Sequence, residues 1–140
     1  MALALLTSSL MGIASLTITI FLGFAIDSRP EVNQHFLFAV FSTFVAVLAH
    51  CMSIFYFIGT AKQVKDLMVE HSERNAFILR TRQFKSRVFP PATYAILFTM
   101  SVFIIGAGVD TQVIPVWIHT TLAMLALLTN LYALVREFKC

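Results

Sequence analysis

The residues that can do chemistry in this chain are a few polar side chains inside long apolar stretches. His50 lies deep within residues 35–59, a stretch that contains no Asp, Glu, Lys or Arg. A histidine in such a place can bind a haem iron, hydrogen-bond a quinone or relay a proton, because imidazole titrates near neutral pH. Burying polar groups in lipid is costly, so such residues are candidates for function.

Three more polar residues are expected at the depth of His50, namely Asn130, Thr99 and Ser53. Asn130 belongs to a face on which small or polar residues recur every three or four positions: His119, Ala123, Ala126, Asn130, Ala133 and Glu137. That face should point into a helix bundle. We predict that His50, Asn130, Thr99 and Ser53 form one polar cluster that can bind a cofactor. The alternative is that they only hydrogen-bond across the bundle, for about 0.6 kcal/mol per contact.

A second set of candidate ligands lies toward the opposite ends of the same apolar stretches. His35, His119 and Asp110 are expected at one level, where two imidazoles and a carboxylate can bind a divalent metal ion. No close-spaced motif fixes their geometry, and the alternative is that water and lipid headgroups solvate them. His119 should lie about 12 Å above His50 by helical rise, which argues against one haem held by these two histidines.

The composition places the chain in a membrane. Hydrophobic residues make up 59% of the 140 residues and charged residues only 12%, against about 25% charged in soluble domains. The mean hydropathy is +0.85. The net charge of +3 follows from residues that orient the chain in a membrane, so we expect no nucleic-acid partner. The two cysteines, Cys51 and Cys140, are expected at different depths and to remain free thiols.

Four stretches are apolar and long enough to cross a bilayer, whose hydrocarbon core of about 30 Å takes roughly 20 helical residues. We predict spans at residues 2–26, 35–59, 92–109 and 113–135. Small residues repeat at three- and four-residue spacing in several of these spans, as in helices that pack closely in lipid. The predicted fold is an all-α integral membrane protein, a single four-transmembrane-helix bundle over residues 1–140.

Residues 60–91 form the largest segment outside the spans and hold seven of the ten Lys and Arg residues. The positive-inside rule places this segment and both termini in the cytoplasm. We predict that the second span continues past Gly59, and that an amphipathic helix capped by Ser72 lies in the headgroup layer and ends at Pro90-Pro91. Anionic inner-leaflet lipids or a partner should contact the basic side chains of Lys62, Lys65, Arg74, Arg80, Arg82, Lys85 and Arg87.

No motif indicates an enzyme. HExxH, GxSxG and the P-loop are absent. No carboxylate falls inside a predicted span, which argues against a small proton-coupled multidrug transporter. No CxxC is present, which argues against a membrane disulfide oxidoreductase.

The sequence therefore favours a non-enzymatic accessory or interaction subunit of a larger membrane complex. We expect a multi-pass protein of a bacterial inner membrane or an equivalent membrane, with other membrane subunits or further copies of itself as partners. The alternative is a membrane electron-transfer protein that binds b-type haem or quinone through His50. A small-solute carrier or channel ranks last, because the interior of the bundle should be mostly apolar.

Overall fold

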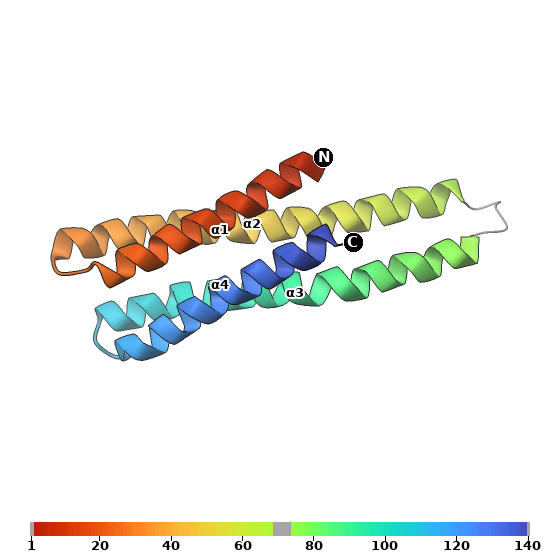
Figure 1. The fold of residues 1–140 in the computed structure, drawn as a ribbon. Helices are drawn as coiled ribbons and strands as arrows, with labels where there is room; N and C mark the ends of the chain where they lie inside the picture. Colours follow the sequence, from red (N-terminus) through yellow and green to blue (C-terminus); the bar gives the residue numbers. More distant parts are fainter. Residues whose placement is uncertain (1, 69–73, 140) are drawn as a thin grey trace.

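The computed structural model describes residues 2–68 and 74–139. Within these residues the regular elements are four α-helices: α1 (Ala2–Phe24), α2 (Arg29–Leu67), α3 (Arg74–Asp110) and α4 (Val116–Phe138). All four are long and apolar enough to span a membrane. Figure 1 shows two antiparallel hairpins, α1–α2 and α3–α4, which lie side by side with α2 against α3.

Two of the helices are much longer than a bilayer requires. α2 has 39 residues and α3 has 37, so they are about 58 Å and 55 Å long, against a hydrocarbon core of about 30 Å. Both continue past the free ends of α1 and α4 (Figure 1). We call residues 60–67 and 74–87 the extension, and we call the opposite end of the bundle, where the chain turns within each hairpin, the turn end.

The third helix differs from the prediction. We expected a separate amphipathic helix before Pro90, but α3 is one helix from Arg74 to Asp110 with Pro90 and Pro91 inside it. A proline keeps a helical φ, and each removes only the donor to the carbonyl four residues earlier. The carbonyls concerned belong to Ser86 and Arg87, both exposed, so solvent can satisfy them. Ser72, the predicted cap, lies outside the described residues, as does Cys140.

Each hairpin closes through its own turn chemistry. Before α2, the backbone N–H groups of Asp27 and Ser28 donate to Oε2 of Glu31 at 2.6 and 2.7 Å. As in a capping box, a side chain in the first turn of the helix accepts hydrogen bonds from the backbone just before it. After α3, the N–H groups of Val113 and Ile114 both donate to the carbonyl of Gly108 at 3.0 Å. These bonds satisfy backbone groups that a helix end otherwise leaves unpaired.

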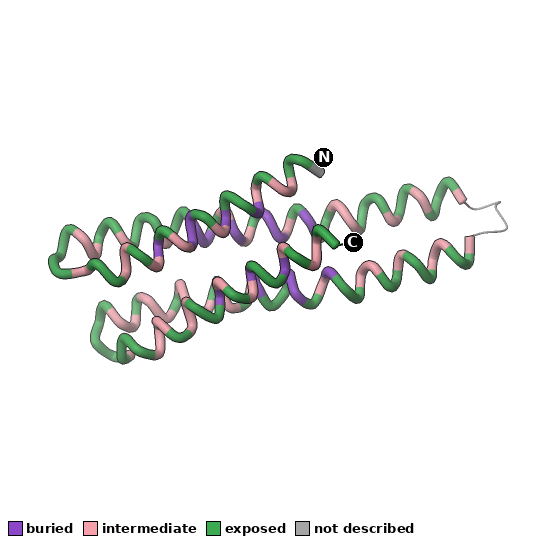
Figure 2. The backbone as a smooth tube through the Cα atoms, viewed as in Figure 1, coloured by how far each residue is buried: buried purple, intermediate pink, exposed green. Residues whose placement is uncertain are grey.

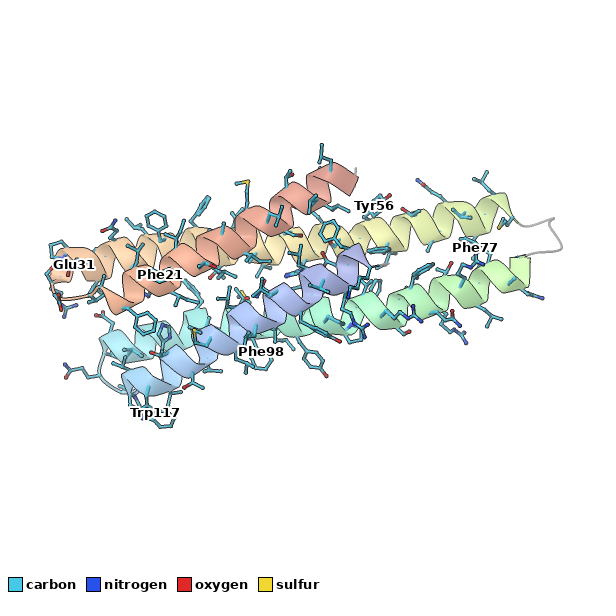
Figure 3. All side chains as sticks on the ribbon, in the orientation of Figure 1. Phe21, Glu31, Tyr56, Phe77, Phe98 and Trp117 are labelled. Atoms are coloured by element: carbon cyan, nitrogen blue, oxygen red, sulfur yellow. The ribbon has the colours of Figure 1, made fainter. Side chains whose placement is uncertain are left out.

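The core of the bundle is built from small residues. The buried apolar residues are Leu16, Ala46, Ala49, Val88, Ala92, Ala95, Ala126 and Ala133. They occupy the middle of the bundle, as the purple segments of Figure 2 show. Large apolar side chains point outward instead (Figure 3), for example Phe21 and Trp117, which are 70% and 69% exposed. This inside-out distribution is the one expected when lipid surrounds the helices.

Close backbone contact joins α1 to α2. A Cβ atom on Gly12 would lie 3.0 Å from the Cα of Ala46, so the two helices touch at this point without intervening side chains. Near this contact, the Thr19 hydroxyl donates to Oγ of Ser42 at 3.0 Å, and both residues are buried. The first hairpin is therefore held by packing of small residues together with interhelical hydrogen bonds such as this one.

At the turn end, Arg29 and Asp110 form an ion pair between the two hairpins, with Nη1 and Oδ1 3.0 Å apart. Their side chains are 80% and 52% exposed, and exposed pairs contribute at most about 1 kcal/mol. We expect Arg29→Gln to change the free energy of unfolding by less than about 1 kcal/mol. Unfolding in mixed detergent and SDS micelles measures this change, and a loss of several kcal/mol would show that the pair is shielded from water.

Candidate functional site

The four polar residues of the predicted cluster do meet inside the bundle. His50 and Ser53 come from α2, Thr99 from α3 and Asn130 from α4. Their exposed fractions are 3%, 2%, 1% and 1%, respectively. The helices can bring them together because alanines and serines surround them on each inward face, which lets the backbones approach closely.

Asn130 sits at the centre of this cluster, and its amide orientation is fixed. Its Nδ2 donates to the carbonyl of Ala126 at 2.7 Å and to Oγ1 of Thr99 at 2.9 Å. The reverse orientation would place two carbonyl oxygens against each other at Ala126. Oδ1 of Asn130 therefore faces Nε2 of His50, 3.0 Å away. An amide oxygen only accepts, so Nε2 of His50 must carry a hydrogen and donate it.

The fifth member of the cluster is Glu137, which lies two residues beyond the predicted fourth span, 113–135. Its Oε1 lies 3.0 Å from Nδ1 of His50. The side chains of His50 and Glu137 are only 4% and 7% exposed. Oε2 of Glu137 accepts a hydrogen bond from the Ser53 hydroxyl at 3.2 Å. Glu137 lies beyond the predicted span 113–135, so the bundle holds a carboxylate although no predicted span contains one.

A signal for Glu137 was present in the sequence. It lies seven residues after Asn130, two helical turns along the same small and polar face. Because α4 continues to Phe138, this face carries Glu137 back into the bundle. The neighbouring Arg136 does not pair with Glu137, and its guanidinium lies 5.4 Å from the ring centroid of Tyr132.

The geometry requires one proton between His50 and Glu137. With a hydrogen already on Nε2, a neutral His50 has a bare Nδ1, which accepts, and an ionised carboxylate also only accepts. A hydrogen bond across the 3.0 Å gap therefore needs an additional proton, held either as imidazolium with carboxylate or as imidazole with carboxylic acid. Both arrangements are neutral overall, which suits a buried pair. The pair can therefore hold and exchange a single proton.

His50 has no free ring nitrogen for the cofactor contact that we predicted. Both of its ring nitrogens are hydrogen-bonded, to Asn130 and to Glu137. A haem iron could bind His50 only if one of these bonds broke. Quinone or haem binding through His50, Asn130, Thr99 and Ser53 stays a prediction.

The second predicted set comes together in part. His35 and His119 lie side by side at the turn end, with ring centroids 6.3 Å apart. Asp110 pairs with Arg29 instead. Within residues 2–68 and 74–139, no group of three or more His, Cys, Asp or Glu residues is placed to hold a metal ion. The two histidines therefore meet without the third protein ligand that we predicted.

Comparison with known protein families, with characterised proteins and with solved structures finds no match to this chain. The function of the chain is therefore inferred from the polar side chains that the helices bring together. Two sites carry that inference: the His50–Glu137 pair in the closed middle of the bundle, and the His35–His119 pair at the turn end. They are 15 residues apart on α2, or about 22 Å along the helix.

Proposed function

We propose that this chain is a non-enzymatic subunit of a larger membrane complex and carries a proton at the His50–Glu137 pair. The observation that carries the proposal is the position of His50, whose ring nitrogens lie 3.0 Å from Oδ1 of Asn130, which only accepts, and 3.0 Å from Oε1 of Glu137. Ionisable residues inside a membrane bundle are costly and mark proton relays or ion pathways. The pair holds one proton in either of two neutral arrangements, which makes it suited to a relay.

The supporting network distinguishes this pair from a chance buried contact. Asn130 fixes the tautomer of His50, and Ser53 donates to the second oxygen of Glu137. Groups that orient a histidine through its other nitrogen are a recurring feature of functional histidines. A buried pair that served only to hold the helices together would need only one such contact. The arrangement instead controls which atom of His50 exchanges a proton.

Two features support a subunit rather than a protein that acts alone. The pair is one proton-holding group in the middle of the bundle, so a path across the membrane needs further groups, which neighbouring subunits can supply. The helices also present large apolar side chains outward, including Phe44, Phe55 and Leu128 at 66%, 71% and 60% exposed. Such surfaces suit contact with lipid and with other membrane helices.

We further propose that both termini and the extension lie on the cytoplasmic side of a bacterial inner membrane or an equivalent membrane. Seven Lys and Arg residues fall in residues 60–91, which meets the positive-inside rule. Most of their side chains are exposed on α2 and α3. Each basic residue near an anionic membrane surface adds about 1 kcal/mol of attraction. These residues can therefore contact anionic lipids or a partner subunit.

The shared proton can be observed directly. We expect solid-state NMR of the protein in liposomes at neutral pH to show a hydrogen on both nitrogens of His50, or infrared spectra to show a protonated carboxyl that belongs to Glu137. Either signal should disappear in Glu137→Gln and change in His50→Gln. Asp66→Asn is a matched control, because Asp66 is an exposed carboxylate on the extension and its removal should leave both signals unchanged.

The proposal is contradicted if His50 is neutral with a bare Nδ1 while Glu137 is ionised, because no proton is then shared. The subunit part has a separate test. In mild detergent, protein extracted from its native membrane should migrate in an assembly larger than the chain and its own oligomers. Migration only as a monomer or homo-oligomer overturns the accessory assignment without affecting the proton pair.

A further inference from the structure

The turn end of the bundle brings two histidines from different hairpins to the same level. His35 lies on α2, near the start of the helix, and His119 lies on the first turns of α4. Their ring centroids are 6.3 Å apart and their planes are inclined by 82°. Each imidazole can ligate a metal, and the proton pair described above does not involve either of them.

Each ring is seated against the other helix of its own hairpin by a glycine. A Cβ atom on Gly23 of α1 would lie 3.0 Å from Cε1 of His35, 3.3 Å from Nδ1 and 3.8 Å from Nε2. A Cβ atom on Gly106 of α3 would lie 3.2, 3.7 and 3.9 Å from the same atoms of His119. The two hairpins therefore hold their histidines alike, with Cε1 of each ring nearest to the glycine and Nδ1 closer to it than Nε2.

Nε2 of neither ring takes part in a hydrogen bond with the described residues, and only His35 is hydrogen-bonded through its other nitrogen. Nδ1 of His35 donates to the carbonyl of Thr19 on α1 at 3.0 Å. Nδ1 of His119 is buried and has no hydrogen-bond partner within the described residues. A metal-ligating histidine characteristically donates from its other ring nitrogen to such a backbone carbonyl, as His35 does. In both residues Nε2 remains available as the ligand.

The spacing of the rings indicates how a metal would be coordinated. An imidazole nitrogen binds a metal at about 2.0–2.1 Å, which places each ring centre about 3.2 Å from the metal. Two rings on opposite sides of one metal are then about 6.3 Å apart, whereas a tetrahedral angle gives about 5.2 Å. The observed 6.3 Å matches ligands on opposite sides. A zinc site of the tetrahedral kind does not fit.

A metal between two opposed imidazoles needs further ligands around its equator. Within the described residues no third His, Cys, Asp or Glu completes a site here. A porphyrin supplies four equatorial nitrogens and leaves two opposed axial positions for histidine. The surroundings suit a planar apolar group, because no residue between 20 and 41 or between 100 and 125 is fully buried. The buried residues lie instead in the middle of the bundle (Figure 2).

We propose that His35 and His119 are the two axial ligands of a b-type haem held between the hairpins at the turn end. Gly23 and Gly106 make room for the two rings, and the carbonyl of Thr19 orients His35. The protein would then carry an electron at this site, in addition to the proton at the His50–Glu137 pair. This proposal does not depend on the proposed function, because it rests on different residues.

The test is haem loading of the full-length protein. The purified protein in detergent is titrated with haemin, and absorption spectra are recorded oxidised and after dithionite reduction. We expect one haem per chain, with a Soret band and sharp reduced α and β bands. Losing even an outer-shell partner costs about 10–100-fold in metal affinity. His35→Ala and His119→Ala should therefore each lower haem affinity by at least about tenfold.

Cys51→Ala is the matched control, because it removes a half-buried side chain of α2 that could bind a metal but is not a proposed ligand, and it should keep the spectrum. His119→Met keeps an axial ligand, so it should retain haem with a raised midpoint potential. Circular dichroism confirms that each variant is helical. The proposal is overturned if haemin does not bind, if it binds equally to the two alanine variants, or if His119→Met leaves the potential unchanged. Binding of zinc or copper alone at these histidines, without haemin, also overturns it.

Discussion

Glu137→Leu should lower the free energy of unfolding by about 3–5 kcal/mol, because it leaves His50 buried without its charged or hydrogen-bonding partner. The side chains of His50 and Glu137 are 4% and 7% exposed, so water cannot replace the lost contact. The Ser53 hydroxyl loses its acceptor as well. Reversible unfolding in mixed detergent and SDS micelles, followed by circular dichroism, measures the change.

A double variant separates the interaction from the loss of each side chain. His50→Leu with Glu137→Leu removes both ends of the pair and leaves no uncompensated charge, so it should be more stable than Glu137→Leu alone. Asp66→Leu, at an exposed position of the extension, should change stability by less than about 0.5 kcal/mol. Additive losses in the double variant would show that His50 and Glu137 do not interact.

The second large loss of stability is expected from a substitution at the contact of α1 with α2. Gly12→Ala should cost about 1–3 kcal/mol, because the added methyl group meets backbone that cannot move alone. That methyl carbon would lie 3.0 Å from the Cα of Ala46 and 3.4 Å from its N and Cβ. To relieve the clash α1 must move away from α2, and the Thr19–Ser42 hydrogen bond must lengthen or break. Unfolding in mixed micelles again measures the loss.

Gly59 provides the matched control for Gly12. It lies within α2, and a Cβ atom added there has nothing within 4 Å. Replacing a glycine inside a helix by alanine then gains roughly 0.5–1 kcal/mol, since the unfolded chain loses conformational freedom. Gly59→Ala should therefore be neutral or stabilising. If Gly12→Ala behaves in the same way, α1 is not seated on α2 as described.

The four helices were predictable because each one follows from the apolar residues of a single continuous stretch of sequence. An apolar stretch of about 20 residues has few alternatives to a spanning helix, and the structure has a suitable helix at each predicted span. The continuation of α2 past Gly59 was also predicted from its helical period. α3 was harder, because Pro90-Pro91 normally indicates a helix boundary. Its unbroken course depends on exposed carbonyls, which the sequence does not reveal.

The sequence predicted at which level of the bundle the residues of the two sites lie, but not which side chains contact each other. Helical rise placed His50 near Asn130, and His35 near His119, at two separate levels. The distances of 3.0 Å and 6.3 Å depend on how the two hairpins face each other, which no local pattern specifies. Glu137 was missed because a charged residue near the end of a span usually belongs to the solvent. Its burial depends on partners from α2, which lie more than eighty residues away in sequence.

The small residues of the core also affect the entropy of folding. Alanine and glycine lose no side-chain freedom on burial, and serine has few rotamers to lose, whereas long apolar side chains lose about 0.5–1 kcal/mol each. Gly12, Ala46, Ala49, Ala95 and Ala133 fill the centre, so ordering it costs little. The long side chains that face outward keep most of their rotamers. The middle of the bundle can therefore be rigid while its outward-facing surface remains conformationally mobile.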